Sequence, residues 1–305
     1  MRGLCSLLLL LNALSPLPGQ SQISLSKKNF GVLLLAHGGS PTWNKEIEKI
    51  KQELRRKYPL EVALGMADYA ETQKAVGRLE SQGVRKIIAV PLYISSYSEV
   101  MEQTEYLLGI RKDPSQTFLA FPHTHGTHAL KKRIQTRLPL SLVRALDGHP
   151  LAAAVLLERA RSLSREPSRE LVALVGHGPV SDEDNAKWLK TMEGLGQTVW
   201  KQGGFAAFWT ATFRDDAAPE VREKAIRELR ERVRQASLKY RVIVLPYLLA
   251  PGGVEGKIRE ALEGLFYVWD GKTLLPHVNI SRWIEESIRE GLTKENMRRY
   301  TGASR

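Results

Sequence analysis

Short apolar runs that end in glycine and histidine are the most regular feature of the chain. Residues 31–36 are apolar or glycine and are followed by His37, and residues 171–176 have the same character and are followed by His177. A run this short and this apolar predicts a strand buried on both faces, as in parallel sheets. Each histidine would then lie at the carboxyl end of a strand, the edge at which open α/β sheets bind ligands.

Amphipathic segments alternate with these runs. In residues 44–58, for example, Ile47, Ile50 and Leu54 recur at helical spacing with charged residues between them. The alternation predicts parallel sheets with helices on both faces. We expect strands at residues 31–36, 61–66, 86–94, 118–121, 171–176, 205–213, 241–249 and 266–269, and helices at residues 44–58, 71–82, 99–107, 151–163, 185–201, 219–240 and 280–291.

The same order of elements occurs twice. The proline-containing strand at residues 86–94 has a counterpart at residues 241–249, and residues 122–150 form an irregular end to the first copy. The sequence therefore predicts an α/β protein of two halves, residues 27–165 and 166–305, each a small parallel sheet with helices on both faces.

The N-terminus is predicted to be a secretory signal covering residues 1–22. Arg2 precedes an apolar stretch at residues 4–11, and small residues with proline follow at residues 15–21. The apolar stretch is too short to span a membrane. We expect export, to the periplasm in a bacterium, or a cytoplasmic location if the segment is not a true signal. Cys5, the single cysteine, lies in this segment, so we expect neither disulfides nor thiolate metal sites in the mature chain.

The formal net charge of +12 favours an anionic partner such as a polycarboxylate substrate. Basic residues alternate with acidic ones along the expected helices, as on solvated helix faces, so we do not expect nucleic-acid binding. The glycine pattern that binds nucleotide phosphates is missing, and we expect no nucleotide cofactor. The mature sequence contains no stretch that predicts a membrane span.

Several motifs together resemble the class II chelatases, and within them the sirohydrochlorin cobalt and iron chelatases. The motifs are residues 34–40 and 90–96, their second copies around His177 and Pro246, and residues 147–151. The resemblance implies flavodoxin-like halves that face each other across a cleft for a planar tetrapyrrole. It also implies insertion of a divalent metal, cobalt, iron or nickel, which is a substrate. In this family a histidine after the first strand and another after the third bind the metal and accept the pyrrole protons.

This chain departs from the family at the second histidine. His37 and His177 occupy the first position, whereas the second position falls on or near Glu99 in one half and Glu255 in the other. Imidazole and carboxylate together suit a divalent first-row metal. We therefore expect His37 with Glu99, and His177 with Glu255, to be catalytic and metal-binding. Alternatively, the two glutamates simply occupy the first turn of a helix, where its dipole favours acids.

Other residues are candidates for contact with substrate or metal. For the macrocycle we expect Tyr97, Ser95, Ser96, Gly252 and Gly253. A group of three histidines beyond the fourth expected strand forms either a further metal cluster or a solvated loop; the group is His123, His125 and His128.

The remaining histidines, aspartates and tryptophans have simpler explanations. We expect helix-start packing for two histidines that adjoin prolines, helix capping for three aspartates and hydrophobic packing for two tryptophans. These residues are His149, His277, Asp68, Asp215, Asp216, Trp43 and Trp188.

Three functions are compatible with the sequence. The first is an exported chelatase that inserts a divalent metal into a carboxylate-bearing tetrapyrrole such as sirohydrochlorin. The second is a non-catalytic exported protein that binds a metal or a tetrapyrrole on the same fold, suggested by the missing second histidines. The third is an unrelated function on this architecture. The sequence leaves open the metal, the macrocycle, the active half and the oligomeric state.

Overall fold

The computed structural model describes residues 29–120, 131–297 and 300. The expected signal at residues 1–22 lies outside these ranges and stays a prediction. The three clustered histidines, His123, His125 and His128, also lie outside the described residues. Within the described part of the chain, no helix has both the length and the apolar character needed to cross a membrane.

The first half is built on a parallel sheet with strand order β2-β1-β3-β4. Its elements are β1 (Gly31–Ala36), α1 (Pro41–Arg55), β2 (Leu60–Leu64), α2 (Tyr69–Ser81), β3 (Ile87–Leu92), α3 (Glu99–Leu107), α4 (Gln116–Leu119), β4 (Leu140–Leu142) and α5 (Pro150–Leu163). Strands β1 and β3 are buried along their whole length, as their apolar runs predict. Because Ala36 pairs with Leu92, the two strands end at the same edge of the sheet.

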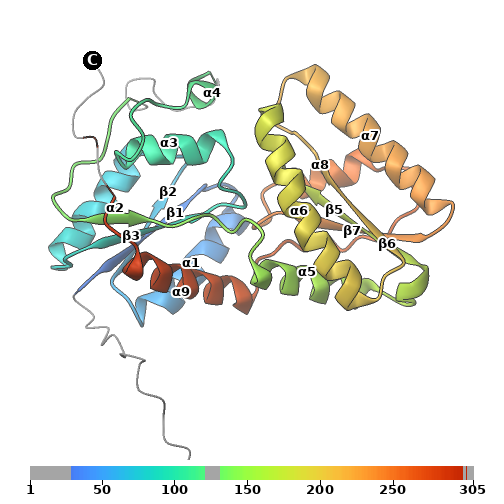
Figure 1. The fold of residues 1–305 in the computed structure, drawn as a ribbon, viewed down its shortest axis with the longest axis horizontal. Coiled ribbons are helices and arrows are strands. Elements are labelled where there is room, and N and C mark those ends of the chain that lie inside the picture. Colours follow the sequence, from blue (N-terminus) through green and yellow to red (C-terminus); the bar gives the residue numbers. More distant parts are fainter. Residues whose placement is uncertain (1–28, 121–130, 298–299, 301–305) are drawn as a thin grey trace, which may run out of the picture.

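The second half has a parallel sheet with order β6-β5-β7 and lies beside the first (Figure 1). Its elements are the 3-10 helix η1 (Pro167–Arg169), β5 (Glu170–Gly176), α6 (Asp182–Gly203), β6 (Ala207–Thr212), α7 (Pro219–Ser237), β7 (Arg241–Tyr247), α8 (Val254–Ala261) and α9 (Val278–Thr293). The register places Val175 opposite Pro246, just as Leu35 lies opposite Pro91 in the first sheet. The predicted α/β class, with parallel sheets and helices on both faces, is confirmed.

Two helices pack across the division expected at residues 165 and 166. Helix α5 packs against α6 and β7 of the second half, whereas α9, the last helix of the chain, packs against β3 and β4 of the first (Figure 1). A side chain at Gly291 would come within 2.5 Å of Ile88, so glycine is what allows α9 to approach β3 closely. Lys86 fixes the end of α9 by donating to the carbonyl of Gly291 at 2.9 Å. The two halves are therefore joined by exchanged helices.

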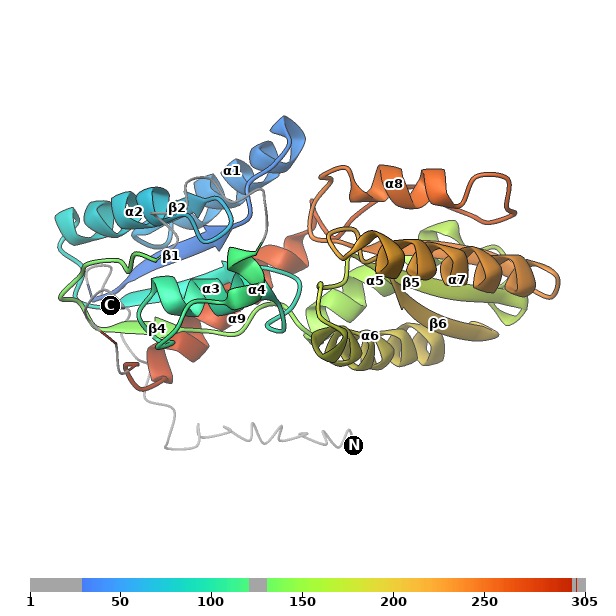
Figure 2. The ribbon, with the colours of Figure 1, turned by 90° about the horizontal axis from the view of Figure 1, so that it is seen from above.

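Two histidines hold these exchanged helices together. His149 and His277 cap the N-termini of α5 and α9 with their Nδ1 atoms, which confirms their expected place at helix starts. Their Nε2 atoms reach the opposite helix: His149 lies 3.3 Å from Glu286 and His277 lies 3.1 Å from Glu158. One hydrophobic core consequently runs through both halves, and each sheet has a further core on its other face. Figure 2 shows the two halves side by side, with α9 among the elements of the first half.

The strand expected at residues 118–121 is wrong. Residues 116–119 form the short helix α4, because Ser115 caps it by accepting from the N–H of Phe118, whose ring is buried. The fourth strand is β4, inside the segment that was expected to be irregular. It has only three residues, too few to show a period in the sequence.

The strand expected at residues 266–269 is also wrong, since only one residue of it pairs. Val268 forms an isolated parallel bridge with Ile243 beyond β7. Phe266 is 86 % exposed and packs against neither sheet. A short apolar run alone did not distinguish a strand from a loop that crosses the end of a sheet.

Candidate active site

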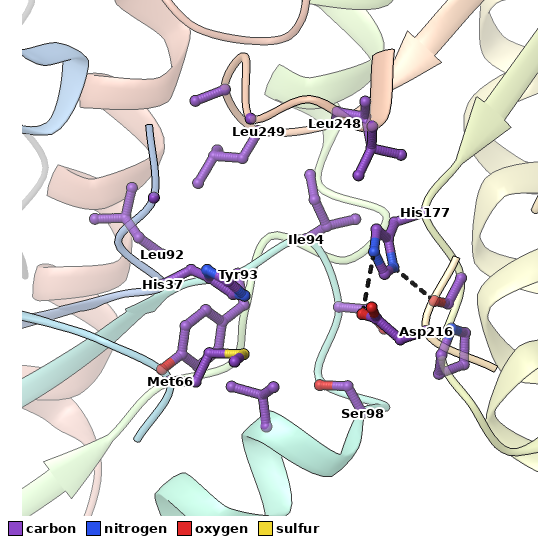
Figure 3. Close-up of a pocket in the computed structure, with 18 of the residues that line it drawn as sticks. His37, Met66, Leu92, Tyr93, Ile94, Ser98, His177, Asp216, Leu248 and Leu249 are labelled. Atoms are coloured by element: carbon purple, nitrogen blue, oxygen red, sulfur yellow. Dashed lines mark hydrogen bonds and ion pairs between the residues drawn. The ribbon is translucent and has the colours of Figure 1, made fainter. Parts of the chain in front are cut away.

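A cavity of about 290 Å³ lies between the two halves, where the carboxyl ends of the central strands meet (Figure 3). It is lined by the turns after β1 and β5 and by the loops after β3 and β7. Most of its wall is apolar, with side chains that include Trp43, Leu92, Ile94, Trp188 and Leu249. The two tryptophans are buried, as expected, and they also face the cavity.

His37 and His177 enter this cavity from two sides with the same local geometry. The Nδ1 atom of His37 lies 2.7 Å from the carbonyl oxygen of Gly38, and Nδ1 of His177 lies 2.8 Å from that of Gly178. A carbonyl only accepts, so Nδ1 carries the proton in both rings. The Nε2 atom of each ring is then available to accept a proton or bind a metal.

Glycine is required after both histidines. Gly38 and Gly178 have φ angles of +72° and +79°, which L side chains rarely adopt. A side chain at Gly178 would also come within 2.6 Å of Thr212. A histidine followed by glycine in the sequence thus indicates a tight turn, and this turn directs the imidazole into the cavity.

Among the described residues, acidic side chains form a group with His177 but not with His37. Asp216 Oδ2 lies 3.3 Å from His177 Nε2, and one oxygen of Asp215 lies within 4.8 Å of both groups. Asp215 is also bound by Lys257 at 2.7 Å. Among the described residues, no acidic side chain forms an ion pair with His37.

The expected capping role of Asp215 and Asp216 is wrong. Helix α7 starts after Ala218 without a side-chain cap, so neither aspartate is needed there. Asp68, after the corresponding strand of the first half, does cap α2 by accepting from the N–H of Glu71 at 2.8 Å. The two aspartates instead lie close to His177.

Glu99 lies at the cavity and faces this same group, although it comes from the first half. Burial raises the pKa of Glu99 above its usual value. His177 and a backbone hydrogen bond from Val180 oppose the rise, and Asp216 adds to it. The sequence paired Glu99 with His37, but the histidine whose charge acts on Glu99 is His177, across the cavity.

Glu255 lines the cavity but is bound to its own loop. Its Oε2 atom accepts from the N–H groups of Gly252 at 3.2 Å and Gly253 at 3.0 Å. This arrangement stabilises the loop that leads into α8, where Gly253 has a φ angle of +110°. Among the residues that the structure describes, Glu255 does not form the expected ion pair with His177. The acid that lies beside His177 is Asp216.

Of the residues expected to contact the macrocycle, some line the cavity and others lie behind its wall. Ser95 and Gly252 line the cavity, whereas Ser96, Tyr97 and Gly253 do not. The carbonyl of Tyr97 accepts from Trp188 Nε1 at 2.6 Å, which ties the loop after β3 to α6. Ser96 donates to the Asp147 carboxylate through N–H at 2.7 Å and through Oγ at 2.8 Å. Tyr97 and Ser96 therefore stabilise the loop that forms the cavity wall but do not line the cavity themselves.

Arg214, which the sequence analysis overlooked, connects the parts of the site. Its φ angle is +57°, its N–H donates to the carbonyl of His177 at 2.7 Å, and its guanidinium donates to the carbonyl of Val180. The same guanidinium lies 3.0 Å from Asp182. Arg214 therefore holds the turn after β5 against the loop that carries Asp216. Its place at the end of β6, next to Asp215, was the only sequence signal.

The fold is that of chelatases. SirB from Bacillus subtilis with Fe³⁺ matches with a TM-score of 0.61 at 14 % identity, over 88 % of this chain and 100 % of that one. The sirohydrochlorin chelatase SirB from Bacillus subtilis subspecies spizizenii in complex with cobalt matches with a TM-score of 0.56 at 12 % identity, over 88 % and 100 %. A multi-domain protein from Deinococcus radiodurans with structural similarity to chelatases matches with a TM-score of 0.53 at 16 % identity; this chain covers 56 % of it, and the match covers 88 % of this chain.

Residues 31–163 match the family model CbiX. This match covers the first half of the chain, and together with the fold it supports a relationship to the class II chelatases. No curated protein matches the sequence.

Proposed function

We propose that the protein is a metal chelatase that inserts a divalent first-row metal, cobalt, iron or nickel, into a planar tetrapyrrole. One observation carries the proposal: two imidazoles enter one apolar cavity, and among the described residues acids form a group with His177 but no ion pair with His37. Insertion needs a group that holds the ion and a base that takes pyrrole protons, and this asymmetry supplies both.

The metal ion is assigned to the group made by His177, Asp216 and Asp215. Two donor atoms that bind one ion at about 2.1 Å with tetrahedral geometry lie about 3.4 Å apart. The His177 Nε2 and Asp216 Oδ2 atoms are separated by 3.3 Å, which fits a shared ion. The carboxylates of Asp216 and Asp215 would balance the charge of a divalent ion, and such mixed ligands suit first-row metals.

His37 is assigned as a proton acceptor. Its Nε2 atom is available, and the ring is exposed, so a proton taken from a pyrrole nitrogen can pass to solvent. Two pyrrole protons leave for each divalent ion that enters. Glu99 can accept the second one, because its raised pKa makes it a better base than an ordinary glutamate.

The apolar wall is assigned to the faces of the macrocycle. Trp43 and Trp188 present large flat rings, and Leu248 and Leu249 supply further apolar surface on the side of the second half. Sirohydrochlorin is the macrocycle that the family resemblance implies, and it is therefore the first one to test.

An insertion assay tests this proposal. Purified protein is supplied with a metal-free tetrapyrrole, sirohydrochlorin first and then porphyrins, together with Co²⁺ or Fe²⁺, and the absorption spectrum is followed. We expect a rate above the uncatalysed one, and we expect it to fall to that level in His177→Ala. A protein that never exceeds the uncatalysed rate with any of these macrocycles contradicts the enzymatic function.

A binding protein without turnover is the second candidate. It is supported by Glu99 and Glu255, carboxylates at positions where the family resemblance implies histidines. Calorimetric titration separates the two functions. Tight binding of metal or tetrapyrrole without metallated product supports a carrier, whereas product formation supports the enzyme.

A further inference from the structure

Lys257 is a cation that lies directly beside the group assigned to the metal ion. It comes from α8, and its Nζ atom donates to Oδ2 of Asp215 at 2.7 Å. The Asp215 side chain is only 10 % exposed, whereas that of Lys257 is 56 % exposed. Asp215 is also one of the three residues with donor atoms within 4.8 Å of one another, together with His177 and Asp216. The lysine therefore bonds to a carboxylate that the ion would share.

The position of Asp215 is set by the backbone around it. Arg214, the preceding residue, donates its N–H to the carbonyl of His177 at 2.7 Å. The carbonyl of Arg214 in turn accepts from the N–H of Ala217 at 3.1 Å, which closes a turn around Asp215. These bonds hold Asp215 next to the turn that carries His177. The ion pair with Lys257 is therefore not needed to bring this carboxylate to the site.

The charge of Lys257 opposes the binding of a second cation at Asp215. Like charges repel, and the energy grows with the product of the charges and falls with their separation. A divalent ion on Asp215 would lie next to the ammonium and would compete with it for the same carboxylate. Because more than half of the Lys257 side chain is exposed, the ammonium can turn into water when the ion arrives.

A chelatase has to give up the ion that it binds. Ligands that bind the ion more strongly before transfer than during transfer slow the reaction, because this binding has to be lost on the way. An imidazole with two carboxylates is a strong set of ligands for a divalent first-row metal. A neighbouring cation that takes back one carboxylate weakens this set as the ion leaves.

Resting on the proposed function, we infer that Lys257 regulates how tightly the metal ion is held by competing with it for Asp215. The ammonium neutralises Asp215 in the metal-free protein, moves away when a divalent ion binds, and returns as the ion passes to the macrocycle. Lys257 acts on the ion only through Asp215, so it is a positioning residue and not a catalytic one.

Titration of Co²⁺ into Lys257→Met tests this competition, because methionine keeps an apolar stem and removes the charge. We expect Co²⁺ to bind about tenfold more tightly than in the unmodified protein, and to pass to an excess of EDTA about tenfold more slowly. Lys257→Arg retains the charge and should bind Co²⁺ within about twofold of the unmodified protein. Lys224→Met, the control, removes an exposed lysine of α7 that pairs with Glu228 and should leave Co²⁺ binding unchanged.

Insertion kinetics provide a readout that a purely structural role would not move in this direction. In Lys257→Met the KM for Co²⁺ and kcat should both fall, because the ion binds more tightly and leaves more slowly. Lys257→Arg should restore both values. A kcat that stays unchanged while KM falls would contradict the role of Lys257 in release.

The outcomes separate this inference from the proposed function. Unchanged or weaker Co²⁺ binding in Lys257→Met overturns the inference and leaves the chelatase proposal intact. Tighter Co²⁺ binding in Lys257→Met, with no insertion into any macrocycle by either protein, supports the competition for Asp215 and overturns the enzymatic function. Failure of the unmodified protein and of both Lys257 variants to bind Co²⁺ overturns the inference together with the assignment of the ion to this group.

Discussion

The Nε2 atom of His177 lies 3.3 Å from Oδ2 of Asp216, while Nδ1 of the same ring is bound to the carbonyl of Gly178. With the ring proton on Nδ1, two electron pairs face each other across this gap, and they repel unless a cation or a second proton lies between them. His37 has the same turn and the same Nδ1 bond, but within the described part of the chain no acid forms an ion pair with it. The different roles that we propose for the two histidines rest on this difference.

Replacing either histidine tests the division of roles. His177→Ala should lower Co²⁺ affinity by about 100-fold, because it removes a ligand, whereas His37→Ala should leave the affinity within about twofold. Isothermal titration of metal alone measures both. His37→Ala should nevertheless slow insertion. Equal losses of metal affinity in the two variants would contradict the assignment.

Asp216→Asn removes a negative charge at nearly constant shape. We expect metal affinity to fall about 10- to 100-fold, because a carboxylate that neutralises and binds the ion becomes a neutral amide. Asp113→Asn makes the same change at an exposed position outside the cavity and serves as the control. Unchanged affinity in Asp216→Asn would exclude Asp216 as a ligand.

Glu99→Gln tests whether the buried carboxyl lowers stability. Burial raises the pKa of Glu99 in the folded state, so the stabilisation that its protonated form provides at low pH is lost as the pH rises through that pKa. At about pH 7 the variant lacks the buried charge and should have a higher Tm than the original protein. The difference should shrink as the pH falls below the ordinary range of glutamate.

Thermal unfolding across this pH range measures the effect. Glu223→Gln, at an exposed acid of α7 outside the cavity, should change Tm little at any pH. A Tm of Glu99→Gln that is lower than that of the original protein at neutral pH would show that the carboxylate stabilises the fold.

Arg214→Ala tests a residue that positions the site without lining the cavity. The change removes the bonds of the guanidinium to the Val180 carbonyl and to Asp182, and should lower the free energy of unfolding by about 2 kcal/mol. We expect metal affinity to fall as well, because the turn with His177 and the loop with Asp216 are no longer tied together.

Arg214→Lys retains the charge and should recover part of the metal affinity, while Arg227→Ala, on the exposed face of α7, should affect neither quantity. Loss of stability without loss of metal affinity would assign Arg214 a purely structural role.

Much of the fold was predictable because buried parallel strands leave a clear signal. The runs that become β1, β3, β5 and β7 are apolar throughout, and turns after β1 and β5 are marked by His37 and His177, each followed by glycine. Strand β4 was missed because three residues show no period. The exchange of α5 and α9 could not be foreseen either, because each helix has an apolar face that suits either sheet.

The sequence predicted the position of the two histidines in the site but not the acids that lie beside them. Topology brings His37 and His177 to strand ends, so their place in the cavity follows from local sequence. Which acid faces which histidine depends on how the halves are joined. Glu99 reaches the His177 group because the two halves pack face to face, a relationship that residue order within one half does not contain.

Anomalous diffraction from crystals of the protein loaded with Co²⁺ tests the central claim most directly. The account predicts a cobalt peak about 2.0–2.2 Å from His177 Nε2 and from a carboxylate oxygen of Asp216, with none on His37. A peak on His37 with the His177 group unoccupied would contradict it.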